Sequence, residues 1–175
     1  MTRYAAFLRG VNLGRRTVRS ADLRAAFEQM GFGDVRTLLA SGNVLFDAGG
    51  ERGLRRKIET GLRAAFGFDI GVVLRSRAAL RAMVASDPYG GVVESDAAKL
   101  HVTLFEAPIP DGFVQPGVPG DFDVARIDTR EIFLIVHRKP DGTYLGTSTL
   151  DTEKRLPKST LVTTRNWNTI LKAIA

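Results

Sequence analysis

The residues best suited to chemistry lie near the end of the chain, in the run TTRNWNT from Thr163 to Thr169. Hydroxyls, amides and one guanidinium follow one another there, whereas a surface helix needs only good helix formers such as Glu and Lys. An Arg side chain donates two parallel hydrogen bonds to a phosphate or carboxylate, and the free amides at the start of a helix attract anions. This run is therefore a candidate anion-binding segment.

Apolar spacing predicts that the same run opens the last helix of the chain. One stripe of that helix would carry four apolar residues: Trp167, Ile170, Leu171 and Ile174. Such a stripe is typical of a helix that faces a core. Thr163 or Thr164 stands where a cap would offer its hydroxyl to the amides of the first turn. The positive end of the helix would then lie beside the guanidinium.

The first part of the chain predicts a β-α-β-β-α-β unit. Short apolar runs suited to strands occur at 4–9, 35–39, 43–46 and 70–74. Amphipathic helical patterns separate the first pair of strands and the last pair. This order is that of a ferredoxin-like unit, a twisted sheet with two helices on one face. The run at 70–74 is apolar throughout, which predicts a central strand.

The second part of the chain predicts a smaller lobe of mixed composition. A helix should follow residue 76, and a strand with two distinct faces covers 100–105. The segment 106–120 is rich in Pro and Gly and reads as an irregular loop, and an antiparallel pair of strands follows it. We therefore predict an α+β protein with two lobes. The ferredoxin-like lobe spans 1–76, the second spans 77–175, and the boundary falls within 75–98.

Composition narrows the chemistry. Of the 175 residues, 44% are apolar and 25% charged, as in ordinary globular proteins. The absence of Cys excludes disulfides, thiolate zinc sites and cysteine nucleophiles. Two His residues leave little for a metal cluster, so we expect neither a metal nor a cofactor. No run approaches the length of about 20 apolar residues that a membrane helix needs, and the first residues do not resemble a signal peptide. We expect a cytoplasmic protein with no membrane association.

Positive charge is concentrated in the first half of the chain. Residues 1–81 hold 15 basic against 7 acidic side chains, a balance of +8, and residues 82–175 hold 10 against 12, a balance of −2. Such asymmetry can mark a half that binds nucleic acid or phosphate. An arginine-rich coding bias is the other explanation, because 19 of the 25 basic residues are Arg.

Three passages together resemble an uncharacterised, mostly bacterial family known as domain of unknown function 1697. They are RGVNLG at 9–14, SGNVLF at 41–46 and TTRNWNT at 163–169. The resemblance extends over the whole chain and implies two α+β lobes, the first ferredoxin-like. It implies no reaction. The first loop of the family usually continues with Gly-Gly-Lys, whereas this chain has Gly-Arg-Arg at 14–16, so no lysine is available there.

Our hypothesis is that the polar residues of the three passages gather in one cleft between the lobes, since ligand sites favour such clefts. The predicted ligand-binding residues are Arg9, Asn12, Ser41, Asn43, Thr164, Arg165, Asn166 and Asn168. The ligand would be small and anionic or phosphate-bearing. Purely structural roles are the alternative, with Asn12 in a left-handed turn and 41–43 as hairpin residues.

Other functions stay open. A ferredoxin-like sheet can bind RNA through exposed aromatic residues, but Tyr4 and Phe7 point to opposite faces and match no aromatic-basic signature, so nucleic acid is less favoured. A homo-oligomer without a ligand is a third hypothesis. An enzyme would need a general base, and none is evident. His101 faces away from Leu100 and Val102, which predicts a surface or half-buried position and not a metal ligand.

Overall fold

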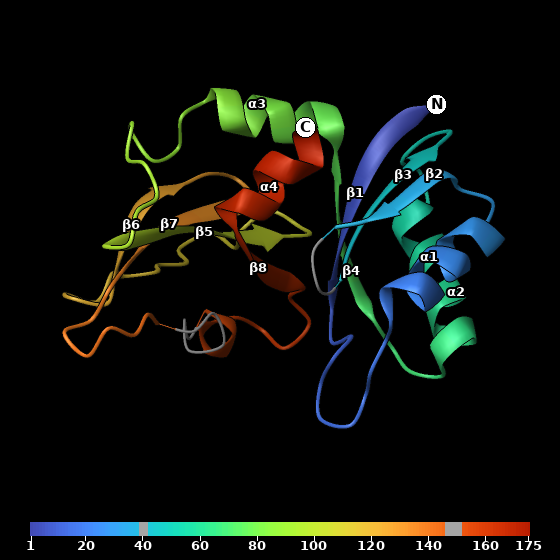
Figure 1. Cartoon of the computed structure of the whole chain (residues 1–175), viewed down its shortest axis with the longest axis horizontal. Coiled ribbons are helices and arrows are strands. Elements are labelled where there is room, and N and C mark those ends of the chain that lie inside the picture. The colour runs from blue at the N-terminus through green and yellow to red at the C-terminus, as the bar shows by residue number, and fades with distance from the viewer. Residues whose placement is uncertain (39–41, 146–151) are drawn as a thin grey trace. The chain divides into compact units, whose positions relative to one another are not determined.

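The structure is a computed structural model that describes three stretches of the chain: 1–38, 42–145 and 152–175. The chain divides into two compact units. Unit 1 consists of Met1–Ala82 together with Leu171–Ala175, and unit 2 consists of Met83–Ile170. Each unit is built on a four-stranded sheet (Figure 1). The prediction of an α+β protein with two lobes is confirmed.

Unit 1 has the predicted ferredoxin-like topology. Its elements are β1 (Thr2–Arg9), α1 (Ser20–Gln29), β2 (Gly33–Thr37), β3 (Asn43–Ala48), α2 (Leu54–Phe66) and β4 (Gly71–Ser76). The strands lie in the order β2-β3-β1-β4, and all neighbours are antiparallel. Both helices lie on one face of this sheet (Figure 1).

Strand β4 lies at the edge of the sheet, so the prediction that 70–74 forms a central strand was wrong. Among the described strands β4 pairs with β1 alone. The run is apolar because both of its faces are buried. Val72 and Leu74 belong to the core under the helices, and Val73 on the other face is also fully buried. Burial of both faces does not fix the number of hydrogen-bonded neighbours.

The core between the helices and the sheet of unit 1 centres on Phe46. Its ring lies 4.8 Å from that of Phe32, 5.2 Å from that of Phe27 and 5.9 Å from that of Tyr4, measured between centroids. Such aromatic pairs contribute about 0.5–1.5 kcal/mol each beyond the area they bury. This cluster joins β1, β3 and α1.

Unit 2 contains a second antiparallel sheet. The remaining elements are α3 (Arg77–Ala85), β5 (Ala98–Phe105), β6 (Phe122–Ile127), β7 (Glu131–His137), the 3-10 helix η2 (Glu153–Arg155), β8 (Val162–Asn166) and α4 (Trp167–Ile174). The strands lie in the order β6-β7-β5-β8. The predicted antiparallel pairing of β6 and β7 is confirmed, and β5 and β7 are central.

Both faces of the second sheet are covered within unit 2. On one face, the Phe133 ring of β7 contacts Tyr89 and Trp167. On the other face, Phe105 packs with apolar residues from the segments that connect the strands, including Phe113 and Leu156. The connections between β5 and β6 and between β7 and β8 therefore form part of the core.

The last residues of the chain return to unit 1. Helix α4 crosses the division, because Ile170 belongs to unit 2 and Leu171 to unit 1. Arg77, the first residue of α3, donates hydrogen bonds from Nη2 to the carbonyl oxygens of Ile174 at 2.9 Å and Ala175 at 3.0 Å. These bonds join the start of α3 to the last residues of the chain, two segments of unit 1 that are far apart in the sequence.

Candidate functional site

The predicted residues of the third passage lie at the junction of β8 and α4. Thr163 and Thr164 are strand residues, and α4 begins only at Trp167, so the prediction that one of these threonines caps the helix was wrong. Threonine is β-branched and favours extended backbone, which here pairs with β5. The first turn is capped by Asn166, whose Oδ1 accepts a hydrogen bond from the Asn168 backbone N–H at 3.0 Å.

Trp167 has a structural role at the start of α4. Its indole is 9% exposed and contacts the rings of Tyr89 and Phe133, at centroid distances of 5.1 and 6.1 Å. Ile170 is fully buried one turn later, whereas Leu171 is 38% exposed and leaves the predicted stripe. The helix therefore buries its Trp167 face in unit 2, which fixes the position of the preceding strand residues.

The register of β8 on β5 separates the predicted residues onto two faces of the sheet. Arg165 is the partner of Val102, whereas Thr164 is the partner of Thr103 and Asn166 that of His101. Side chains directly opposite one another in an antiparallel pair share a face, and successive side chains alternate. Arg165 thus lies on the face of Val102, and Thr164 and Asn166 belong to the opposite face.

The guanidinium of Arg165 is held close to its own strand. Nη1 donates hydrogen bonds to the Thr163 hydroxyl and to the Thr164 carbonyl oxygen, the latter at 3.0 Å. Burial lowers the pKa of Arg165 to about 10, because a poorly solvated environment disfavours the charged form. The side chain remains protonated at neutral pH, at a cost in desolvation.

A buried polar group occupies the other face of the same strands. The hydroxyls of Thr103 and Thr164 are hydrogen-bonded at 2.8 Å. His101, two residues from Thr103, is 9% exposed, and its Nδ1 is buried with no hydrogen-bond partner in the described part of the chain. Burial lowers the pKa of His101, and the nearby Glu94 carboxylate opposes this shift.

The sequence prediction for His101 was wrong about its burial. The pattern at 100–105 placed His101 on the less apolar face of the strand, but Phe105 belongs to that face too and is fully buried. This aromatic residue was the available signal that both faces of β5 are covered. The Tyr89 hydroxyl donates to the His101 carbonyl oxygen at 2.6 Å, which fixes the backbone there.

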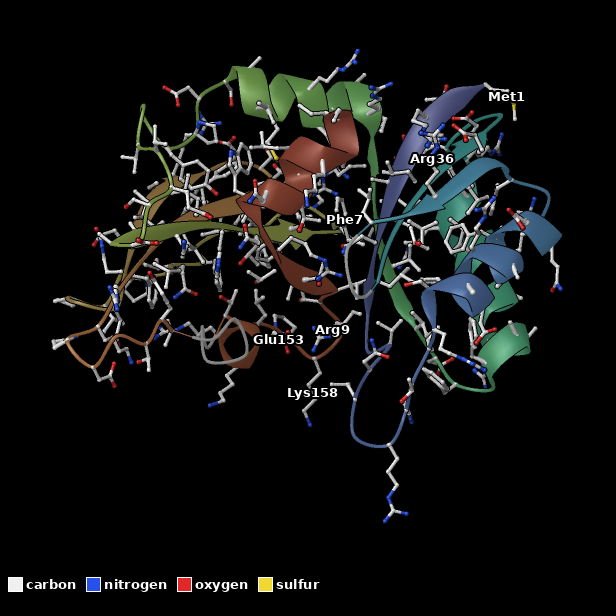
Figure 2. The ribbon with its side chains drawn as sticks, in the orientation of Figure 1. Met1, Phe7, Arg9, Arg36, Glu153 and Lys158 are labelled. Carbon is white, nitrogen blue, oxygen red and sulfur yellow. The ribbon has the colours of Figure 1, made fainter. Side chains whose placement is uncertain are left out.

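In unit 1, three predicted residues lie at one end of the sheet. Arg9 is the last residue of β1 (Figure 2), and Asn43 is the first residue of β3 and the partner of Phe7. The Leu8 N–H donates to the Gly42 carbonyl at 2.7 Å. The loop after β1 and the turn before β3 therefore meet at the same end. Ser41, the fourth residue predicted here, lies outside the described residues.

Both asparagines of this end make structural hydrogen bonds. Asn12 Oδ1 accepts a bond from the Val18 N–H at 3.1 Å, which closes the loop after β1. In the described chain, the non-glycine residues with positive φ are Asp34 and Asp87, so the left-handed alternative for Asn12 was wrong. Asn43 Nδ2 donates to the Leu38 carbonyl at 3.1 Å, a bond within the hairpin. The Asn12 side chain is exposed, whereas Asn43 is buried.

The loop after β1 carries cationic side chains into solvent. Arg15 and Arg16 are exposed, and the Arg16 guanidinium lies 4.6 Å from the centre of the Phe68 ring. This cation–π contact brings the loop against the segment that follows α2. Part of the positive charge of the first half of the chain is thus displayed at the sheet end that holds Arg9.

Metal ligands do not cluster in the described residues, where no group of three or more His, Asp or Glu side chains could hold an ion. Nor does any helix in the described stretches combine the length and the apolar character needed to cross a membrane. The chemistry available at the two sites consists of guanidinium, amide and hydroxyl groups, which bind anions and polar ligands.

Comparison with known proteins agrees with the fold. No curated protein sequence matches this chain. The conserved bacterial protein SP0830 from Streptococcus pneumoniae has a similar structure, with a TM-score of 0.70 over 99% of this chain and 96% of that chain, at 22% sequence identity. A family model described as a protein of unknown function matches residues 1–133, a range that ends before the TTRNWNT run. The chain therefore belongs to the DUF1697 family.

Proposed function

We propose that this protein binds a small anionic or phosphate-bearing ligand through Arg165 and the polar groups beside it. The observation that carries the proposal is the half-buried guanidinium of Arg165, whose hydrogen-bond acceptors include the Thr163 hydroxyl and the Thr164 carbonyl and whose pKa is lowered by burial. Burial disfavours the charge, and a bound anion would favour it again. Ligand binding and the charged state of Arg165 would then stabilise each other.

The start of α4 supports the same ligand class. The helix begins two residues after Arg165, and its backbone dipoles place partial positive charge at that end. Backbone N–H groups at a helix start bind phosphate and carboxylate oxygens. Asn166 caps the first turn through the Asn168 N–H and keeps this end ordered.

The polar end of unit 1 supplies a second set of residues for an anion. Arg9 and the exposed Arg15 and Arg16 lie at or next to the loop that Asn12 closes. That this set and Arg165 bind the same ligand stays a prediction. It requires Arg9→Gln and Arg165→Gln each to weaken the binding of one and the same ligand, at a stoichiometry of one ligand per chain.

RNA binding by aromatic stacking on the first sheet receives less support. Tyr4 and Phe46 stack on each other in the core under the helices, with both side chains buried. Phe7 on the opposite face is also fully buried. These three residues therefore do not offer an exposed stacking platform of the kind used by RNA-binding sheets.

The intrinsic fluorescence of Trp167, the single tryptophan, provides the test. We expect inorganic phosphate or pyrophosphate to change this fluorescence saturably, because the indole lies two residues from Arg165. Arg165→Gln should weaken binding about 10-fold or more, the loss of one charge-assisted bidentate contact. Arg165→Lys should retain the charge but lose part of the affinity, because Lys lacks the planar fork.

Arg155→Gln is the matched control, since Arg155 is an exposed side chain of the same unit. Melting temperatures of all variants separate a folding defect from a binding defect. The proposal fails if neither fluorescence nor calorimetry detects binding up to about 10 mM ligand. It also fails if Arg165→Gln, folded like the wild type, binds with unchanged affinity.

A further inference from the structure

We propose a second binding site in unit 2 that takes a short zwitterionic peptide. A pocket of about 760 Å³ lies between the residues that precede β5 and the turn that follows β7, and it is lined by 96–97 and 138–142. The pocket is largely open to solvent, and four of its seven lining residues are charged. None of the residues proposed to bind the anion lines this pocket, so the two proposals are independent.

The backbone around the pocket is fixed by hydrogen bonds. The Arg138 N–H donates to the Ala97 carbonyl at 2.9 Å, which extends the pairing of β5 and β7 beyond the strand ends. The Gly142 N–H donates to the Lys139 carbonyl and the Lys139 N–H to the Thr143 carbonyl, both at 2.8 Å. The pocket is therefore formed by an ordered turn against a sheet end.

Arg138 supplies the group that would bind a carboxylate. Its side chain is exposed and makes no ion pair or hydrogen bond to the described residues, although two aspartates, Asp96 and Asp141, are among the residues that line the same pocket. The guanidinium lies against Gly142, with Nη2 only 3.3 Å from the place that a Cβ atom would occupy there. Gly142 has a φ of +84°, so glycine allows both the turn and the close approach of Arg138.

The acidic residues of the pocket require a ligand that also carries a positive charge. Asp96 and Asp141 both line it. The Asp141 carboxylate accepts hydrogen bonds from the Thr143 hydroxyl at 2.6 Å and the Thr143 N–H at 2.9 Å, which hold the pKa of Asp141 below its usual value. Lys139 also lines the pocket; it pairs with Asp121 at 3.3 Å, and its charge contributes to the lowered pKa of Asp141.

A simple anion on Arg138 would meet repulsion from the two carboxylates, and a simple cation would meet the guanidinium. A peptide with free ends carries an ammonium group for the acids and a carboxylate for Arg138. The pocket is largely open to solvent, so a peptide of a few residues can lie across it with part of its length exposed. The charge pattern thus distinguishes this ligand class from the anion proposed for Arg165.

Triglycine and its two blocked forms test the charge requirement. Amide chemical shifts of the 15N-labelled full chain should move saturably with triglycine, at residues 96–97, 138–139 and 141–142. N-acetyl-triglycine lacks the ammonium group and triglycinamide lacks the carboxylate, so each should bind about 5-fold more weakly or worse. Equal binding of N-acetyl-triglycine would overturn the proposal in favour of an anion site, and the absence of any shift up to about 20 mM triglycine would overturn it altogether.

Matched variants assign the two charges. Arg138→Gln should weaken triglycine binding about 10-fold and leave little difference between triglycine and triglycinamide. Asp96→Asn should reduce triglycine binding toward that of N-acetyl-triglycine. Arg155→Gln, an exposed arginine of the same unit, should change neither. All three positions are exposed, and the spectra themselves report whether each variant is folded; unchanged affinity in a folded Arg138→Gln protein contradicts the site.

Discussion

The two sheets of this protein have the same strand order but are connected in different ways. Taken in chain order within each unit, the strands lie as second, third, first and fourth, namely β2-β3-β1-β4 and β6-β7-β5-β8. In unit 1 the connections from first to second and from third to fourth strand are α1 and α2. In the described part of the corresponding connections of unit 2, the sole helical element is the short η2.

This difference shows what the helices contribute. A helix satisfies its own backbone N–H and C=O groups, so α1 and α2 can cover the sheet with apolar side chains alone. An irregular segment lacks this regular pairing, so its backbone groups bond within turns or to other segments, as the Ile109 N–H does to the Thr129 carbonyl at 2.8 Å, and side chains add further bonds. In unit 2 the Thr152 hydroxyl donates to Gln115 Oε1 at 3.0 Å, and both residues are buried. The same irregular backbone also forms the turn of the Arg138 pocket.

The largest expected effect compares the two cores directly. Phe46 in unit 1 and Phe133 in unit 2 are both fully buried in aromatic clusters. Replacing either with Ala should lower the free energy of unfolding by about 3–5 kcal/mol, because a cavity is left in packed surroundings. Urea denaturation followed by circular dichroism and by Trp167 fluorescence measures both.

Phe46→Leu and Phe133→Leu serve as controls, since they keep most of the volume and should cost clearly less than Ala. If Phe133→Ala costs less than about half as much as Phe46→Ala, the sheet of unit 2 is less tightly packed than its exposure values indicate. The two units would then differ in the packing of their cores as well as in the connections between their strands.

A smaller effect is expected from the buried polar pair of unit 2. Gln115→Leu removes a hydrogen bond of 3.0 Å between two buried side chains and should lower the free energy of unfolding by about 1 kcal/mol, the usual net contribution of such a bond. The double variant with Thr152→Val should recover most of this loss. Urea midpoints give both values. No recovery in the double variant would show that Thr152 acts mainly through other contacts.

The pH dependence of stability should also differ between the units, because both histidines belong to unit 2. Burial lowers the pKa of His101 below 6.5, so the unfolded chain binds a proton that the folded chain does not. Stability should therefore fall as the pH decreases through 6.5 toward the lower pKa of the folded state, and be unaffected by this group above 6.5.

Urea midpoints of the wild type and of His101→Gln between about pH 7.5 and pH 5.5 measure this contribution. His101→Gln should show a flatter profile than the wild type. An identical slope in the wild type and in His101→Gln would mean that other groups cause the acid sensitivity.

The smallest expected effect concerns the surface of α1. Arg24 Nε and Glu28 Oε1 form an exposed ion pair at 2.8 Å, one helical turn apart. Glu28→Gln should lower the free energy of unfolding by only about 0.3–0.5 kcal/mol, since solvent screens such pairs. Repeating the measurement at high salt should remove even this difference. A decrease in the free energy of unfolding of more than about 1 kcal/mol would show that ion pairs on the helix surface contribute more to the stability of unit 1 than we infer.

The sequence was sufficient for the topology of unit 1 because its periodicities alternate clearly between strand and helix. It could not place β4 in the sheet. Apolar residues such as Val72 and Val73 indicate that both faces of the strand are buried, but they do not indicate how many strands are hydrogen-bonded to it. In unit 2 the alternation at 100–105 was read correctly, but the covering of both faces depends on connections with no periodicity.

The candidate site was predictable in its residue types and less so in its geometry. The face occupied by Arg165 depends on its belonging to β8, which ends at Asn166, and not to α4, which begins at Trp167. Successive strand residues point to opposite faces, so a shift of the strand register by three residues would move Arg165 to the other face of the sheet. That boundary is decided by pairing with β5, some sixty positions earlier in the chain, which local propensity does not report. Arg138 was not among the predicted residues, because nothing near it in the sequence indicates that its backbone pairs with Ala97.

The return of the chain's end to unit 1 has a consequence for anyone who dissects the protein into fragments. A single cut after residue 82 removes Leu171–Ala175 from unit 1 and with it the carbonyl groups that Arg77 binds. The complementary fragment carries those five residues without their partner. A faithful fragment of unit 1 therefore needs the terminal pentapeptide rejoined to it through a linker.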